Sequence, residues 1–257
     1  MGMKEERAVF ASSSQNARVM TEDWAKRSLF CPNCSNNSLR PFAANKPVAD
    51  LFCEACAEEF ELKSQARPFG RKVVDGAHRT MIERITAANN PSLILIHYAK
   101  ETASISKVIL VPKFHFSLSA IEKRKPLADT ARRAGWVGCN ILLDRIPAAG
   151  KIPIVTDSLF VPTHSVREKW QRTAFLNSAD INARGWLLAT IKCVEQTTGP
   201  EFHLSQIYDR EPQLSAEFPN NRNIRAKLRQ QLQVMRDRGM LQFLGNGRYR
   251  KTVTFFS

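Results

Sequence analysis

Long apolar runs are missing from this sequence of 257 residues. No stretch approaches the roughly 20 apolar residues that a membrane-spanning helix needs. The opening run Met-Gly-Met-Lys-Glu-Glu has no apolar core of the kind that secretory signals carry. We therefore expect a cytoplasmic protein without a membrane partner. An RNA-recognition signature is also missing, and the five histidines show neither an HExxH motif nor a catalytic-triad context.

Acidic residues are scarce, because 24 Asp and Glu stand against 38 Lys and Arg, for a formal net charge of +14. Such an excess favours a polyanionic partner, since each neutralised phosphate releases condensed counterions. Nucleic acid fits this charge better than a membrane surface does. With 43% hydrophobic residues the chain can also build a core, so disorder is not expected.

The chain has only six cysteines, and they are unevenly distributed. Two stand alone and are expected to be buried small hydrophobes. The other four form two Cys-x-x-Cys pairs, Cys31/Cys34 and Cys53/Cys56, with 18 residues between them. Four thiolates at this spacing can close a tetrahedron around zinc and leave no open coordination position. We therefore predict a structural zinc site; two redox or incidental pairs are the alternative.

Apolar periodicity predicts helices over residues 14–27 and 74–88, and strands over 47–53, 59–63, 93–98 and 107–112. This order predicts a mixed sheet with helices packed against it. Residues 119–138 interrupt the pattern with Lys, Arg, Pro and Gly, and are expected to form a basic loop. A new pattern starts near Ile181, so we predict two domains, 1–180 and 181–257.

Two carboxylates and a lysine converge if the strands at 47–53 and 59–63 pair. Side chains alternate along a strand, so Glu61 and Lys63 share one face, which Asp50 can reach from the neighbouring strand. Such a trio suits phosphodiester hydrolysis, in which carboxylates hold Mg²⁺ and a lysine orients the water. The alternative is a solvated strand face without a function.

The C-terminal part is basic, and Asp237 is the only acid between residues 219 and 257. Apolar residues at helical spacing predict one buried helix face, formed by Ile224, Leu228, Leu232 and Met235. A separate side collects Arg222, Arg225, Arg229, Gln233 and Arg236. Arginine reads guanine and glutamine reads adenine in the major groove by paired hydrogen bonds.

A β-hairpin is predicted after this helix, since Gly245-Asn246-Gly247 separates two strand-like runs, the second of which begins at Arg248. Further helices are expected within residues 178–194 and 203–217. Helices followed by a basic hairpin predict a winged-helix domain that binds DNA. A merely solvated basic helix is the alternative.

The acidic trio resembles the PD-(D/E)xK nuclease motif. Further stretches, in order along residues 15–251, are similar to the DpnI-type methyl-directed restriction endonucleases. The similar runs are Thr21–Trp24, Cys31–Cys34, Pro47–Asp50, Glu58–Ser64, Arg124–Ala128, Thr130–Trp136, Gly138–Asn140, Arg229–Gln233 and Gly247–Lys251.

The resemblance implies an α/β (α+β) fold, in which a PD-(D/E)xK mixed sheet with a four-cysteine zinc site precedes a C-terminal winged-helix domain. It implies that Asp50, Glu61 and the Leu62 carbonyl hold Mg²⁺, with Lys63 beside the attacking water. These residues would make the protein a type II deoxyribonuclease.

The resemblance also implies a substrate: double-stranded DNA at GATC sites whose adenines carry N6-methyl groups, cut to leave 5′-phosphate ends. Trp136 would lie against the methyl groups, with Arg132 and Arg133 near phosphates or guanines. We expect a monomer of the bacterial cytoplasm that has no small-molecule substrate. A non-catalytic zinc-ribbon and winged-helix regulator is the alternative function, although a pure binder has no use for an acidic centre.

Overall fold

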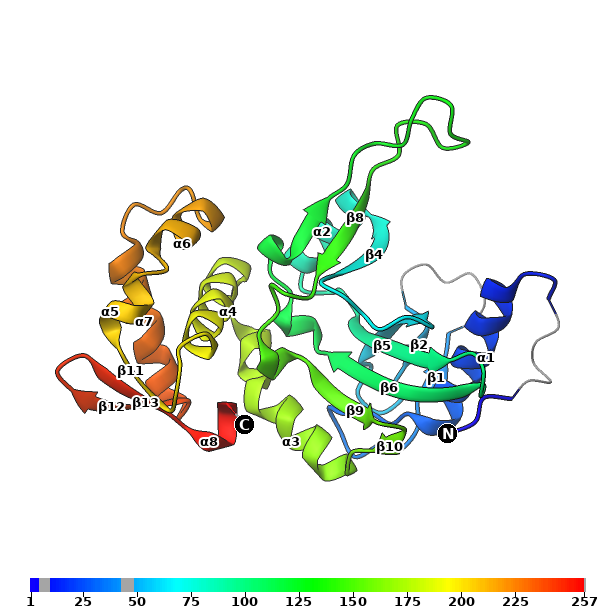
Figure 1. The fold of residues 1–257 in the computed structure, drawn as a ribbon, viewed down its shortest axis with the longest axis horizontal. Helices are drawn as coiled ribbons and strands as arrows, with labels where there is room; N and C mark the ends of the chain where they lie inside the picture. The colour runs from blue at the N-terminus through cyan, green and yellow to red at the C-terminus, as the bar shows by residue number, and fades with distance from the viewer. Residues whose placement is uncertain (5–9, 43–48, 257) are drawn as a thin grey trace. The chain divides into compact units, whose positions relative to one another are not determined.

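A computed structural model describes residues 1–4, 10–42 and 49–256 (Figure 1). The chain forms two compact units, each of which combines three separate segments. The first unit consists of Met1–Val73, Thr86–Phe114 and Gly150–Asn177, and the second of Val74–Ile85, His115–Ala149 and Ser178–Ser257. The predicted division at residue 180 stays a prediction. None of the described helices is both long and apolar enough to cross a membrane.

The first unit is built on a mixed seven-stranded sheet of order β1-β2-β3-β5-β6-β9-β10. Strands β3 and β5 run parallel, and the other neighbouring pairs are antiparallel. Nearly every residue of β5 is buried, as expected of a strand that is covered on both faces. The strands are β1 Arg40–Pro41, β2 Leu51–Phe52, β3 Glu59–Gln65, β5 Ser92–Ala99, β6 Ser104–Val111, β9 Ile152–Thr156 and β10 Leu159–Phe160.

Two helices pack on this sheet. Helix α1 (Ser13–Ser28) lies against β3 and buries Trp24 and Ala25, and α3 (Thr163–Thr173) lies against β9 and buries Trp170. The Trp170 ring meets Phe114 edge to face, at a centroid distance of 5.2 Å. Short 3₁₀ turns occur at Lys113–His115, Leu118–Ala120, Ala148–Gly150 and Ala174–Ser178.

The second unit holds a three-stranded sheet of order β4-β8-β7, with helix α2 directly after β4. Figure 1 shows a long arm, in green, that connects β7 to β8. The elements are β4 Lys72–Ala77, α2 His78–Thr86, β7 Ile121–Lys123 and β8 Gly138–Leu142.

The rest of the second unit combines helices with a small sheet of order β11-β13-β12, in which both pairs are antiparallel. Its chain order of helix, strand, helices and hairpin is that of a winged helix. The elements are α4 Ile181–Glu195, β11 Glu201–His203, α5 Leu204–Tyr208, α6 Glu211–Glu217, α7 Ile224–Asp237, β12 Leu241–Gly245, β13 Arg248–Lys251 and α8 Val253–Phe256.

Several sequence predictions need correction. The helix predicted at 74–88 is wrong over its first part, because Val73 and Asp75 alternate with exposed neighbours in β4 and the helix begins only at His78. The strand predicted at 47–53 is confirmed only at Leu51–Phe52, and residues 47 and 48 lie outside the described residues. The predicted basic loop at 119–138 is shorter than expected, because β7 and the first residue of β8 occupy its two ends and these strands pair with each other.

Candidate functional site

The four paired cysteines meet in the first unit. Their sulfur atoms all lie within 4.8 Å of one another, and all four are free thiols rather than disulfides. Cys31 Sγ lies 3.5 Å from Cys56 Sγ, and Cys34 Sγ lies 3.6 Å from Cys53 Sγ. Zn–S bonds of about 2.3 Å in a tetrahedron place the sulfurs about 3.8 Å apart. The spacing therefore fits a closed zinc site.

The pKa of the Cys53 thiol is lowered, whereas burial raises the pKa of Cys31 and of Cys56. Burial opposes the charged form, but backbone N–H groups of Cys56 and Ala55 and the side chains of Asn36 and Cys34 together lower the pKa of the Cys53 thiol to about 7. The Asn36 amide donates to Cys53 Sγ over 3.5 Å. N–H donors of this kind stabilise a thiolate that ligates a metal.

Helix α3 holds the first Cys-x-x-Cys turn from the outside. Arg167 donates from Nε to the Cys31 carbonyl at 3.3 Å and from Nη2 to the Asn36 carbonyl at 3.2 Å, and its guanidinium lies over the Phe30 ring. Trp170 donates from Nε1 to the Asn33 side chain at 3.1 Å. No local pattern indicates these contacts, because they join residues more than a hundred positions apart.

The second turn is anchored to the sheet by Glu58. Its carbonyl accepts from the Cys53 N–H at 2.9 Å, and its buried carboxylate accepts from Ser92 Oγ at 2.9 Å and from Lys113 Nζ at 2.8 Å. A carboxylate at such depth needs these partners, because an unpaired buried charge is costly. Both cysteine turns are thus fixed by groups outside the ligand set.

Of the predicted catalytic trio, Asp50 directly precedes strand β2, and Glu61 and Lys63 lie on the neighbouring strand β3. The predicted pairing is confirmed: β2 and β3 are antiparallel, and the Asp50 N–H donates to the Phe60 carbonyl at 2.9 Å. The Asp50 Oδ2 atom accepts from the Leu62 N–H at 2.7 Å, and Lys63 Nζ lies 2.6 Å from Glu61 Oε1. The structure thus brings the Asp50 carboxylate to the backbone beside Glu61.

Helix α1 adds a charge to this group. Arg18 Nη2 lies 3.9 Å from Asp50 Oδ1, and Arg18 also pairs with Glu22 one turn along the helix. The hydrogen bond and charge of Glu22, followed by the weaker effect of Asp50, raise the pKa of Arg18. Asp50, Glu61 and Lys63 keep 26%, 21% and 26% of their side chains exposed. The side chains of the site are therefore partly accessible to solvent.

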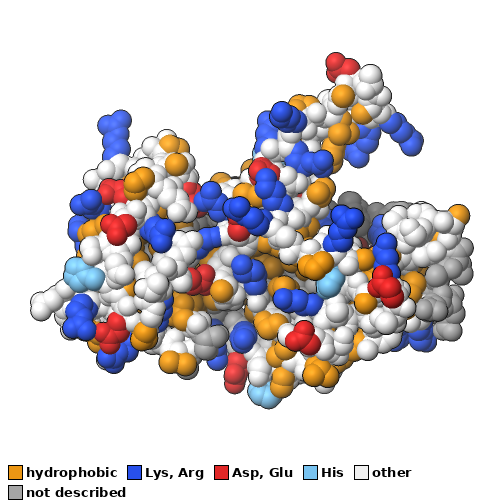
Figure 2. Space-filling view, viewed as in Figure 1, with side chains coloured by type: hydrophobic (Ala, Val, Ile, Leu, Met, Phe, Trp, Pro, Cys, Tyr) orange, Lys and Arg blue, Asp and Glu red, His pale blue; other side chains and the backbone are white. Residues whose placement is uncertain are grey.

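The arm between β7 and β8 carries the aromatic residue singled out in the sequence. Trp136 is half-buried, and the Arg133 guanidinium lies 4.8 Å from its ring centroid. The Leu127 N–H donates to the Trp136 carbonyl at 2.9 Å, which closes the base of the arm. Arg132 and Arg133 are exposed, and Figure 2 shows Lys and Arg side chains along the arm.

Helix α7 has the two faces that its sequence predicts. Ile224, Leu228, Leu232 and Met235 are buried, whereas Arg225, Arg229, Gln233 and Arg236 are exposed. Arg222 is a correction: it lies before the helix, because the turn-forming run Pro219–Asn223 delays the first helical residue to Ile224.

Two family models match the sequence. The model of the Dam-replacing family, named DpnI, matches residues 4–179, and that of the Dam-replacing HTH domain matches residues 182–251. The chain belongs to the Dam-replacing family. The resemblance found in the sequence is thereby confirmed, and so is the predicted fold class: a mixed sheet with a four-cysteine cluster and a C-terminal helix-turn-helix domain.

The helix-turn-helix match covers α4 to β13, and α7 is the last helix of that match before the hairpin. Membership and this domain imply that the protein binds DNA. The wing carries the predicted Arg248 at the start of β13, where Nη2 lies 2.8 Å from Glu201. The adjacent Arg250 pairs with the same carboxylate at 2.7 Å, and hydrogen bonds from Arg250 and then Arg248 lower the pKa of Glu201.

The donor set of the acidic group fits the magnesium ion that the nuclease motif implies. Asp50 Oδ1 and the Glu61 carboxylate are oxygen donors at a partly exposed strand edge, and Mg²⁺ prefers a small number of carboxylates together with water. The hydrogen bond from the Leu62 N–H fixes the other oxygen of Asp50.

Proposed function

We propose that this protein is a Mg²⁺-dependent, type II restriction endonuclease that cuts both DNA strands at GATC sites whose adenines carry N6-methyl groups. Residues 1–180 would cleave the DNA and residues 181–257 would read it. The observation that carries the proposal is the Asp50 carboxylate, held at 2.7 Å on the Leu62 N–H beside the Glu61–Lys63 pair. Membership of the Dam-replacing family supports it.

Each residue of the trio has a distinct task in this proposal. Asp50, Glu61 and the Leu62 carbonyl hold Mg²⁺, which when bound supplies Lewis-acid stabilisation of the phosphate and lowers the pKa of a water. The Lys63 ammonium orients the attacking water and stabilises the charge that develops on the phosphate oxygens. Water adds to phosphorus, the bond to the 3′ oxygen breaks, and that oxygen takes a proton, which leaves a 5′-phosphate and a 3′-hydroxyl.

Reading of the methyl groups is proposed for the arm. An indole edge or face offers an apolar wall to a methyl group, and the proposal assigns the exposed Arg132 and Arg133 to phosphates or guanines. Burial of one methyl group is worth about 0.8 kcal/mol, or roughly fourfold in binding. Strong discrimination therefore needs a second reader, a task that the proposal gives to α7 and Arg248 of the wing.

Charge-removing variants test catalysis apart from binding. Asp50→Asn keeps an oxygen that accepts from the Leu62 N–H but loses the charge, so cleavage of methylated plasmid should fall by about 10³-fold or more while DNA binding persists. Glu54→Gln removes a charge in the same way from an exposed residue of the turn between β2 and β3, and should cut normally. Undiminished cleavage by Asp50→Asn would place the active site elsewhere. A wild-type protein that binds methylated DNA and never cuts would favour the regulator.

A further inference from the structure

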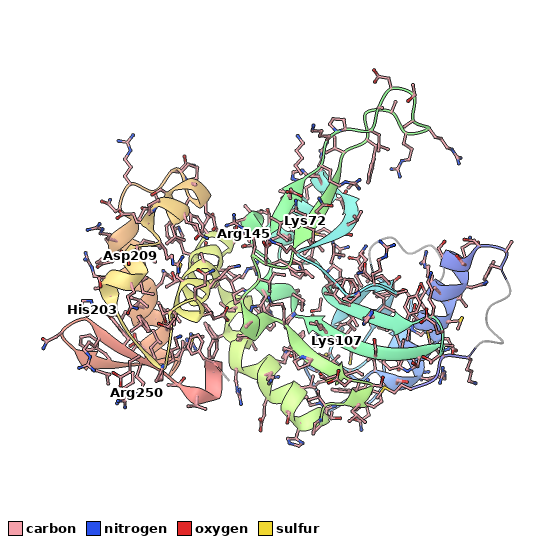
Figure 3. The ribbon with its side chains drawn as sticks, viewed as in Figure 1. Lys72, Lys107, Arg145, His203, Asp209 and Arg250 are labelled. Carbon is pink, nitrogen blue, oxygen red and sulfur yellow. The ribbon has the colours of Figure 1, made fainter. Side chains whose placement is uncertain are left out.

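Tyr208 lies where helix α5 packs against α7, the recognition helix of the proposed function, and its backbone is firmly held. It is the last residue of α5, next to the fully buried Ile207, and Asp209, labelled in Figure 3, follows it. A capping box between His203 and Gln206 fixes the start of the same helix. The Tyr208 ring therefore projects from a well-defined point.

Two recognition-helix arginines contact this one side chain. Arg229 donates from Nη1 to the Tyr208 hydroxyl at 2.8 Å. The Arg225 guanidinium lies over the Tyr208 ring, 5.2 Å from the centroid, and its Nε also donates to Glu211 at 2.7 Å. Arg229 thus binds the hydroxyl of this tyrosine by a hydrogen bond, and Arg225 contacts its ring by a cation–π interaction.

The geometry of these arginines distinguishes them from others on α7. Arg225 and Arg229 are one helical turn apart and are both exposed. Tyr208 and Glu211 hold them from other elements, whereas Arg236 pairs with Asp237 of its own helix. A long arginine side chain loses rotamer freedom when it binds, and restraint before binding reduces that loss.

We propose that Tyr208 is a positioning residue that presents Arg225 and Arg229 to guanine edges in the major groove of double-stranded DNA. The proposal rests on the proposed DNA-reading function and adds to it a residue outside the recognition helix. Bidentate reading of guanine depends on the orientation of the guanidinium plane. A correctly oriented Arg229 therefore raises affinity for the specific site more than affinity for unrelated DNA, where phosphate contacts dominate.

Tyr208→Phe tests the hydroxyl by itself, because the ring beneath Arg225 remains. Binding of the full-length protein, without Mg²⁺, is measured on a methylated GATC duplex and on a duplex of unrelated sequence. We expect Tyr208→Phe to weaken specific binding about threefold to tenfold, the effect of one ordinary hydrogen bond, and to change non-specific binding less. Tyr208→Leu should weaken specific binding further. Tyr98→Phe, the same change in strand β5, is the matched control.

A double-mutant cycle with Arg229→Ala decides whether Tyr208 acts through Arg229. If Tyr208 acts through Arg229, Tyr208→Phe has no further effect in the Arg229→Ala background. Equal losses on both duplexes, or additive losses in the cycle, would show a merely structural role and overturn the proposal. If Arg229→Ala weakens specific binding and Tyr208→Phe does not, the positioning role of Tyr208 is excluded, while the reading role of α7 stands. If neither Arg225→Ala nor Arg229→Ala matters, the reading function of α7 fails as well.

Discussion

The indole of Trp136 lies directly over Gly138. A Cβ atom added to residue 138 would meet Cη2 and Cζ3 of this ring at 2.8 Å, closer than real Cβ atoms approach. Gly138 is buried at the start of β8, where the chain returns from the arm. Only a residue without a side chain lets the ring rest on the strand in this way.

Gly138→Ala should displace Trp136 without removing it. We expect the preference for methylated over unmethylated duplex to fall by about fourfold to sixteenfold, the binding value of one or two buried methyl groups. Gly76→Ala in β4 is the control, because an added Cβ there meets nothing within 4 Å. A Gly138→Ala protein with full methyl preference would remove Trp136 from this role.

The four-cysteine cluster predicts one zinc ion per chain. Cys34→Ala should lose the metal and lower the unfolding temperature by about 5–10 °C, because metal binding contributes to folding free energy. Cys193→Ala, which removes a buried thiol from α4, should keep one zinc. Metal content by mass spectrometry and thermal unfolding measure both. A wild-type chain that folds identically without zinc contradicts the interpretation.

Arg167 should determine how tightly that zinc is held. Removal of its bonds to the Cys31 and Asn36 carbonyls leaves the first cysteine turn less fixed, so Arg167→Ala is expected to weaken zinc affinity about tenfold. Arg172→Ala changes an arginine of the same helix whose ion pair with Glu168 lies within α3, and should have no effect. Competition with a chelator measures the affinity, and equal values for the two variants would contradict the expectation.

Buried His115 predicts a dependence of stability on pH. Burial, and then the charge of Arg184, lower the pKa of His115 to about 3. The unfolded chain, with a histidine pKa of about 6.5, therefore binds more protons between these values. Stability is complete above about pH 6.5 and falls as the pH drops towards 3, by about 2 kcal/mol between pH 7 and pH 5. For His115→Gln, the free energy of unfolding measured with denaturant should depend less on pH. An unchanged dependence would show that His115 is not its cause.

Local spacing explains what could be predicted from the sequence. The cysteine turns and the Glu61–Lys63 pair depend on residues two or three apart, and the pairing of β2 with β3 needs only a short connection. The buried face of α7 follows from helical periodicity in the same way. These features form wherever the local pattern is satisfied.

The missed features depend on distant partners. Arg167 contacts Cys31 across 136 positions, and Tyr208 contacts Arg229 across 21, so no periodicity indicates either residue. Residues 74–77 are predicted to be helical, because the apolar spacing of 77–88 also fits the residues before it. Pairing with β8, more than sixty residues away, makes that segment a strand.

The most direct measurement is cleavage of one plasmid, prepared with and without N6-methyladenine at GATC, by the full-length protein in Mg²⁺. We expect that only the methylated plasmid is cut, with ends at GATC sites. Cleavage of both plasmids would contradict methyl reading, and cleavage of neither would contradict the nuclease itself.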